Sequence, residues 1–186
     1  MDELRKAAVL TELADRMREG GRWCAETQLQ KAVYFLQELF DVPTEFSFIL
    51  YKHGLFSFGL RDELTSLRAD GLLQLRPRPT PYGPTLVATD QSEVLRGSFP
   101  KTLSTYRDQI SFIAKHLGPR TAPELERLST ALYVIRKAPR GKSVEELAQE
   151  LTELKPHVSP VEAEKAVKEA QEIIQQAESL QQPATP

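Results

Sequence analysis

The pattern of apolar positions is most pronounced between Thr27 and Phe40, where it predicts a helix at the centre of the fold. At about 100° per residue, one face of this helix is apolar throughout. It consists of Leu29, Ala32, Val33, Phe35, Leu36, Leu39 and Phe40. Gln30, Lys31, Tyr34, Gln37 and Glu38 fill the remaining arc. We expect this helix, including Tyr34, to lie in a core; a groove lined by Tyr34 is the alternative.

The same spacing predicts helices on both sides of this central one. The first runs from Asp2 to Arg18, and we expect Gly20-Gly21 to end it. From Gln91 onward the chain is predicted to be helical, with segments that begin near Pro100, Thr121, Ser143 and Ser159. The last two of these starts are S-x-x-E capping boxes. The final helix is predicted to end near Leu180, before a disordered tail at residues 183–186.

Strand signals are confined to the first half of the chain. The aromatic and β-branched run Phe46–Tyr51 predicts one strand. After it, Ser57 is a suitable N-cap for a third helix, Phe58–Ala69, whose inward positions are Leu60, Leu64 and Leu67. Leu72–Leu75 and Thr85–Thr89 then predict two short strands. The basic loop between them holds four prolines and a glycine, which exclude regular structure.

A helix followed by two strands with a basic loop between them is the order of a helix and a β-wing. We therefore predict an α+β, mostly helical protein. Residues 1–90 would form a winged-helix-like domain with a small antiparallel sheet, and residues 91–182 a helical domain packed on it.

Composition narrows the class of protein. The chain has 186 residues and a formal net charge of -2, which argues against a globally basic nucleic-acid binder. From Arg140 onward there are five Lys and Arg against nine Asp and Glu, so the acidic excess lies in the last helices. One cysteine and three histidines exclude a disulfide framework and a Cys/His zinc cluster. With neither a membrane-spanning run nor a signal peptide in the pattern, we expect a cytoplasmic protein without metal or cofactor.

Catalytic motifs do not emerge from the sequence. The stretch Gly54–Gly59 lacks the Lys-Ser/Thr of a phosphate-binding loop and has one residue too many before Ser57 for a nucleophile elbow. Gly54 is interpreted as a turn glycine. We therefore predict that the protein is not an enzyme.

The most distinctive surface is basic. Arg61, Thr65 and Arg68 share one face of the third helix, Arg76 and Arg78 lie at the base of the wing, and Lys52 and His53 precede the helix. Several cations on one surface can bind phosphates or an anionic partner. The alternative is an ordinary solvated helix face, because Asp62 and Glu63 lie on the same helix. For His53, the alternative is a solvated histidine or one that caps the turn.

Two other features are interpreted as structural. A second basic cluster is expected to be a solvated loop between helices: Arg136, Lys137, Arg140 and Lys142. Trp23 is expected to pack as an anchor in front of the central helix, in the manner of a hydrophobic staple.

Several short segments resemble a known family. Leu29–Leu36 and His53–Ser57, followed by Leu60–Leu64 and Gly71–Leu73, are similar to the YwgA-like proteins and, more distantly, to the Panacea domain of bacterial antitoxins and proteolysis adaptors. Both carry an L-x-K-x-x-Y-F/I-L helix and an H/Y-G-P-Y/F-S turn, in which Leu55 replaces the family's proline. A weaker similarity continues into Leu128–Arg136 and Leu154–Pro160. The resemblance implies a winged-helix-like domain with added helices and a regulatory or defence-associated task, and it brings no catalytic residues.

These observations predict a non-enzymatic regulatory protein that binds a macromolecular partner. The partner is a protein, as for an antitoxin or adaptor, or DNA bound through the third helix and the wing. The alternative is an oligomerisation module without nucleic-acid binding, a homodimer formed through the final helices, where Ile173 and Ile174 lie among Glu and Gln.

Overall fold

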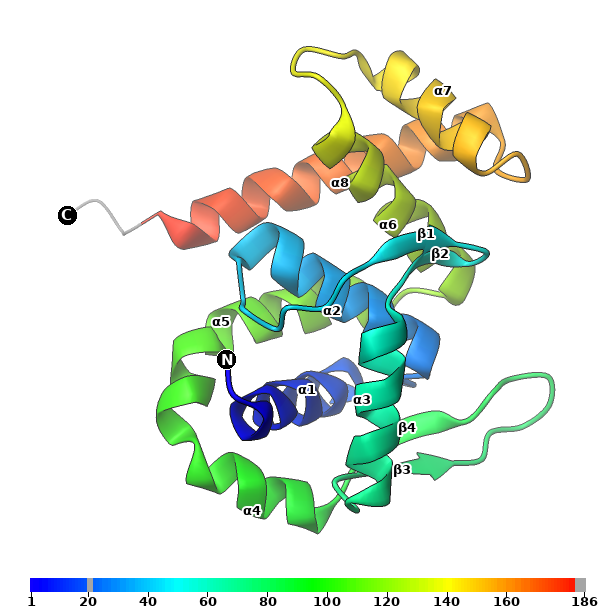
Figure 1. Cartoon of the computed structure of the whole chain (residues 1–186). Helices are drawn as coiled ribbons and strands as arrows, with labels where there is room; N and C mark the ends of the chain where they lie inside the picture. Colours follow the sequence, from blue (N-terminus) through cyan, green and yellow to red (C-terminus); the bar gives the residue numbers. More distant parts are fainter. Residues whose placement is uncertain (20–21, 183–186) are drawn as a thin grey trace. The chain divides into compact units, whose positions relative to one another are not determined.

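The computed structural model describes residues 1–19 and 22–182 (Figure 1). It is 66% helical with two small antiparallel sheets of two strands each, which confirms the predicted α+β, mostly helical class. The elements are α1 (Glu3–Met17), α2 (Glu26–Phe40), β1 (Ile49–Tyr51), β2 (Gly54–Phe56), α3 (Phe58–Ala69), β3 (Leu73–Arg76), β4 (Thr85–Ala88), α4 (Asp90–Ser98), α5 (Pro100–Leu117), α6 (Ala122–Lys137), α7 (Val144–Leu154) and α8 (Pro160–Gln181). The predicted helix stop at Gly20-Gly21 and the predicted tail at 183–186 lie outside the described residues.

The chain divides into two compact units, and the division does not fall at residue 90. The first unit comprises Met1–Ile49 and Phe56–Arg120, and the second comprises Leu50–Leu55 and the described residues from Thr121 onward. In the first unit α4 and α5 both pack against α1, and α5 also packs against α2. In the second unit α6, α7 and α8 pack against one another. The predicted boundary grouped α4 and α5 with the later helices. Their contacts with α1 and α2 instead place them in the first unit.

A buried arginine fixes α4 to α1 in the first unit. One guanidinium nitrogen of Arg96 lies 3.1 Å from the carboxylates of both Glu12 and Asp15, and its side chain is only 10% exposed. Two carboxylates around one largely desolvated guanidinium satisfy its charge. The helix that follows β4 is therefore held on the same core as α1.

The central helix α2 is buried, as predicted. Leu29, Ala32, Val33, Phe35 and Leu36 are inaccessible to solvent. Part of the remaining arc is buried as well, since Gln30, Lys31 and Tyr34 are almost inaccessible, whereas Gln37 and Glu38 are partly exposed. Tyr34 is thus a core residue, and its ring packs edge-on against Phe48 at a centroid distance of 5.2 Å.

Two glutamines of α2 bind backbone groups of the segments that follow it. The Gln30 amide donates to the carbonyl oxygen of Ser57 and accepts from its N–H, both at 2.9 Å. Gln37 contacts Phe46 in the same way, at 3.0 and 2.9 Å. Each side chain supplies the pair of hydrogen bonds that a neighbouring strand would supply. The predicted strand Phe46–Tyr51 is therefore wrong for its first half, and pairing begins only at Ile49.

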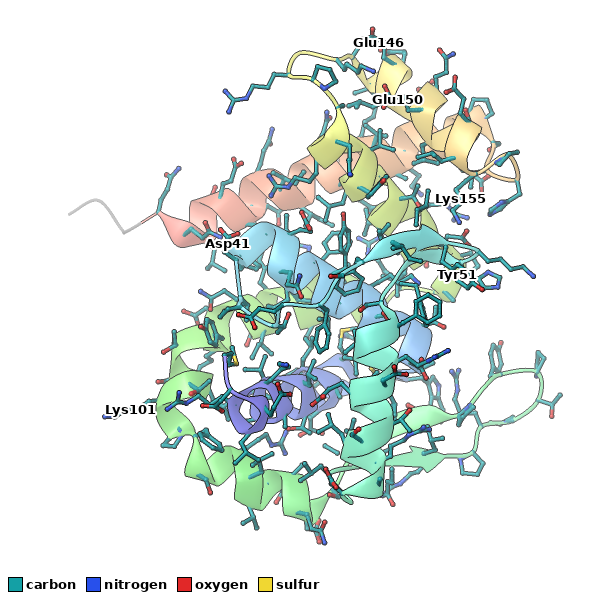
Figure 2. All side chains as sticks on the ribbon, in the orientation of Figure 1. Asp41, Tyr51, Lys101, Glu146, Glu150 and Lys155 are labelled. Atoms are coloured by element: carbon teal, nitrogen blue, oxygen red, sulfur yellow. The ribbon has the colours of Figure 1, made fainter. Side chains whose placement is uncertain are left out.

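β1 and β2 form a short hairpin, and β2 is a strand that the sequence pattern did not predict. Gly54, with φ of 88°, begins β2 and permits the reversal of the chain. The buried ammonium group of Lys155 donates to the carbonyl oxygens of Tyr51 and Lys52, at 2.7 and 2.8 Å, and lies 3.1 Å from a carboxylate oxygen of Glu126 (Figure 2). These contacts explain why Leu50–Leu55 belongs to the second unit.

We use the name wing for the hairpin of β3 and β4 with residues 77–84 between them. β3 and β4 pair antiparallel from Leu73 opposite Ala88 to Arg76 opposite Thr85, close to the predicted strands. The other edge of β4 is also paired, because the Leu86 N–H donates to the carbonyl oxygen of Cys24 at 2.8 Å. The Cys24 N–H in turn donates to the Thr85 hydroxyl at 3.0 Å. Cys24, which precedes α2, thus lies beside β4.

The single cysteine provides a test of this packing. Cys24 is inaccessible, and burial raises the pKa of its thiol to about 12. Because the thiolate is the reactive form, we expect Ellman's reagent to label the native protein at pH 8 at least 100-fold more slowly, to order of magnitude, than the protein in guanidinium chloride. Rapid labelling of the native protein would contradict the position of Cys24 beside β4.

Candidate functional site

The structure orients α3 as its sequence predicts. Leu60, Leu64 and Leu67 are buried, and the Ser57 hydroxyl accepts from the Leu60 N–H at 3.2 Å as the N-cap. Because Gln30 binds the backbone of this same Ser57, the start of α3 is fixed to the buried helix α2. The opposite face of α3 is consequently turned to solvent.

The exposed face of α3 presents arginines beside polar and aromatic neighbours. A guanidinium nitrogen of Arg68 donates to the Thr65 hydroxyl at 3.2 Å. The guanidinium carbon of Arg61 lies 5.1 Å from the centre of the Phe58 ring, and Arg61 also contacts Asp62 at 3.4 Å. Arg61, Thr65 and Arg68 do share one face, as predicted, but the adjacent Asp62 reduces its positive charge.

On the wing, Arg78 packs against two aromatic rings. Its guanidinium carbon lies 4.5 Å from the centre of the Trp23 ring and 4.7 Å from that of Tyr82. These distances are in the range of cation–π contacts. The Trp23 and Tyr82 side chains are nevertheless 43% and 61% exposed. We call Trp23, Arg78 and Tyr82 the Arg78 cluster.

The position of Trp23 differs from the prediction. Trp23 was expected to anchor the start of α2, yet a large part of its ring faces solvent, and the adjacent Cys24 is the buried residue. The backbone pairing of Cys24 with β4 explains the difference, because successive side chains of an extended segment point in opposite directions.

Five of the seven predicted site residues lie in the first unit. They are Arg61, Thr65, Arg68, Arg76 and Arg78. We define the α3–wing surface as these five residues together with Phe58, Trp23 and Tyr82. Lys52 and His53 are exposed in the turn between β1 and β2 and belong to the second unit, so we leave them out of this definition.

The aromatic members of the α3–wing surface were missed from the sequence. Phe58 lies outside the stripe of Leu60, Leu64 and Leu67, and Tyr82 lies in a loop rich in proline and glycine. A large apolar residue outside the inward-facing positions of an element is the available signal for both. For Trp23 the sequence offers no such signal, since its exposure depends on the pairing of Cys24 with β4.

The second basic cluster lies around the end of α6 and the loop that follows. Arg136, Lys137 and Arg140 are exposed, and Lys142 forms an ion pair with Glu150. The ammonium group of Lys137 lies 5.4 Å from the centre of the Tyr133 ring. Only Arg140 and Lys142 lie in the predicted loop, because Arg136 and Lys137 belong to the last turn of α6.

The findings on metal sites, membrane-spanning helices and relatives are negative. In residues 1–19 and 22–182, no three His, Cys, Asp or Glu side chains are grouped so that they could hold a metal ion. Over the same residues, no helix has the length and apolar character needed to cross a membrane. No protein-family model matches the chain, and no curated protein is significantly similar to it in sequence.

Proposed function

We propose that the protein is a non-enzymatic interaction module that binds a partner protein through its α3–wing surface. The observation that carries the proposal is the kind of side chain exposed there. Arg61 and Arg78 are each packed against exposed aromatic rings. Protein interfaces are enriched in Arg, Trp, Tyr and Phe and poor in Lys. From His53 to Pro100, a stretch that includes α3 and the wing, the sequence contains no lysine.

Packing of the arginines on aromatic rings also lowers the entropic cost of binding. A free arginine loses rotamer entropy when a partner immobilises it. Arg61 and Arg78 already contact Phe58, Trp23 and Tyr82 in the unbound chain. An antitoxin-like or adaptor-like role, in keeping with the resemblance to YwgA-like and Panacea proteins, would use such a surface.

A second candidate partner is duplex DNA, and the pairing of Cys24 favours it. We infer a winged-helix-like arrangement in the first unit, with the segment at Cys24 in the place of the first strand and α3 in the place of the recognition helix. Arg61, Arg68 and Arg76 would then be the phosphate contacts. The negative charge of Asp62 on the same face ranks DNA below protein.

Homodimer formation through α8 is less well supported than binding of a partner protein or of DNA. Ile173, one of the two residues that suggested it, is buried, and α8 packs against α6 and α7 of its own chain. A strict monomer in sedimentation at high protein concentration would exclude it.

Photo-crosslinking tests the protein-binding proposal. Benzoylphenylalanine in place of Phe58 or Tyr82, in cells that express the chain, is expected to trap one and the same partner protein. Val94 on α4 is the control position, because it is also exposed in the first unit but lies outside the α3–wing surface. Identical products from all three positions, or none from Phe58 and Tyr82, would refute the proposal.

The DNA candidate has a separate readout. Phosphate contacts make the logarithm of the affinity fall linearly with the logarithm of the salt concentration. If a DNA duplex binds in this way, and Arg61→Glu with Arg68→Glu reduces both the affinity and its salt dependence, DNA is the partner. If the double variant changes neither, this candidate is refuted.

A further inference from the structure

The Arg78 cluster contains a positive charge that lacks a negative partner. Arg78 is in none of the ion pairs between described residues, and its Nε atom is buried without a hydrogen-bond partner. Arg96, in contrast, has the carboxylates of Glu12 and Asp15 within 3.1 Å of its guanidinium group. The rings of Trp23 and Tyr82 stabilise the charge of Arg78 but accept none of its in-plane hydrogen bonds.

This arrangement suits an anion that approaches in the plane of the guanidinium group. Rings at 4.5 and 4.7 Å restrict the positions that the group can take. The remaining N–H donors keep the fork geometry that binds a carboxylate or a phosphate with two parallel hydrogen bonds. Arg76, exposed two residues earlier, adds a second positive charge on the same wing.

We propose that the Arg78 cluster is an anchor for a carboxylate side chain in an acidic segment of the partner protein. The inference depends on the proposed function, because it specifies the chemistry of the partner at one point of the α3–wing surface. Charge complementarity supports an acidic segment, since Arg76 and Arg78 are the charged residues of the wing from Leu73 to Ala88.

The chemistry around the cluster favours a peptide over a nucleic acid. The rings of Trp23 and Tyr82, which flank Arg78, are both exposed to solvent. Apolar and aromatic area next to a few arginines is typical of the centre of a protein interface. A phosphate backbone instead requires a row of cations, and the lysines that usually complete it are absent between Lys52 and Lys101.

The site contains its own reporter, because Trp23 is the only tryptophan of the chain. We would titrate the full chain with a decaglutamate peptide and, separately, with decaglutamine and a short DNA duplex of mixed sequence, and follow the emission of Trp23. Decaglutamate is expected to give a saturable change, and decaglutamine and the duplex none. Isothermal titration calorimetry of the same mixtures measures affinity independently of the fluorophore.

Three variants identify the residue responsible. Arg78→Gln is expected to weaken decaglutamate binding about tenfold or more, the usual size of a loss at an interface anchor. Arg78→Lys keeps the charge but loses the fork, so its affinity should lie closer to that of Arg78→Gln than to the unmodified chain. Arg107→Gln, an exposed arginine of α5 in the same unit, is the matched control and should bind normally.

Each other outcome overturns the inference. Binding of the duplex but not of decaglutamate would make the site a nucleic-acid contact, and equal affinities of the Arg78→Gln and Arg107→Gln variants would remove Arg78 from the site. The experiments distinguish an error in this inference from an error in the proposed function. If cross-links from Phe58 and Tyr82 persist while Arg78→Gln binds decaglutamate normally, the surface is correct and the anchor is wrong.

Discussion

Replacing Lys155 with methionine is expected to destabilise the protein by roughly 3–5 kcal/mol, as is usual when one partner of a buried ion pair is removed. The Lys155 side chain is 6% exposed, and its ammonium group contacts two carbonyl oxygens and the carboxylate of Glu126. Methionine fills similar space but donates no hydrogen bond. It leaves the carbonyl groups of Tyr51 and Lys52 without this donor and the Glu126 carboxylate with only the His157 imidazole, at 3.3 Å, nearby.

Urea unfolding of the full chain measures this effect, and Lys165→Met is the matched control. Lys165 is exposed on α8, in the same unit, so its replacement should change the free energy of unfolding by less than about 0.5 kcal/mol. If both variants unfold at the same urea concentration as the unmodified protein, Lys155 does not hold the β1–β2 turn.

Replacing Gln30 with alanine is the second large expected effect. The substitution removes both hydrogen bonds to the backbone of Ser57, a buried residue, and each unsatisfied group is expected to cost about 1–3 kcal/mol. Because Ser57 is the N-cap of α3, the loss should also loosen the first turn of that helix. Hydrogen exchange of the amides of α3 would report the loosening.

The variant Gln30→Glu distinguishes the contribution of the Gln30 hydrogen bonds to stability from that of its side-chain packing. A glutamate of nearly the same shape still accepts from the Ser57 N–H but faces the Ser57 carbonyl oxygen without a donor, and it buries a charge. It should therefore destabilise the protein although it leaves no cavity. Gln176→Ala, at an exposed position of α8, is the control. A stable Gln30→Glu variant would mean that side-chain packing alone explains the role of Gln30.

The sequence could predict α3 because its signals are local. Ser57 caps the helix, and Leu60, Leu64 and Leu67 repeat at helical spacing, so the observed bounds agree with the predicted ones. The strands β3 and β4 were predicted for the same reason, since the prolines between them exclude regular structure between two short apolar runs. Local signals also located Arg61 and Arg68 on the exposed face.

The remaining features depend on contacts between distant residues. The ammonium group of Lys155 binds the backbone of Tyr51, more than one hundred positions away, and no spacing rule links the two. The strand is shorter than predicted because the Gln37 side chain, which donates to the Phe46 carbonyl and accepts from its N–H, takes the place of a neighbouring strand. The Arg78 cluster likewise combines Trp23 with the wing. Such contacts are decided by tertiary packing, which overrides local preference.

The division into units has the same origin. The change from strands to helices after β4 suggested a boundary near residue 90. The charge network of Arg96 and the packing of α5 on α1 and α2 keep that part of the chain in the first unit. A change from strands to helices therefore indicates a domain boundary less reliably than the ion-pair partners of a largely buried arginine such as Arg96.

The most direct test of the α3–wing surface as the contact surface is calorimetry with the partner protein trapped from Phe58 or Tyr82. Two double charge reversals are compared: Arg61→Glu with Arg68→Glu on α3, and Lys101→Glu with Arg107→Glu on α5, whose side chains are exposed in the same unit (Figure 2). We predict that the α3 variant loses at least about tenfold in affinity while the α5 variant stays within about twofold of the unmodified chain. Equal losses in both variants, or none in either, would contradict the assignment of the α3–wing surface.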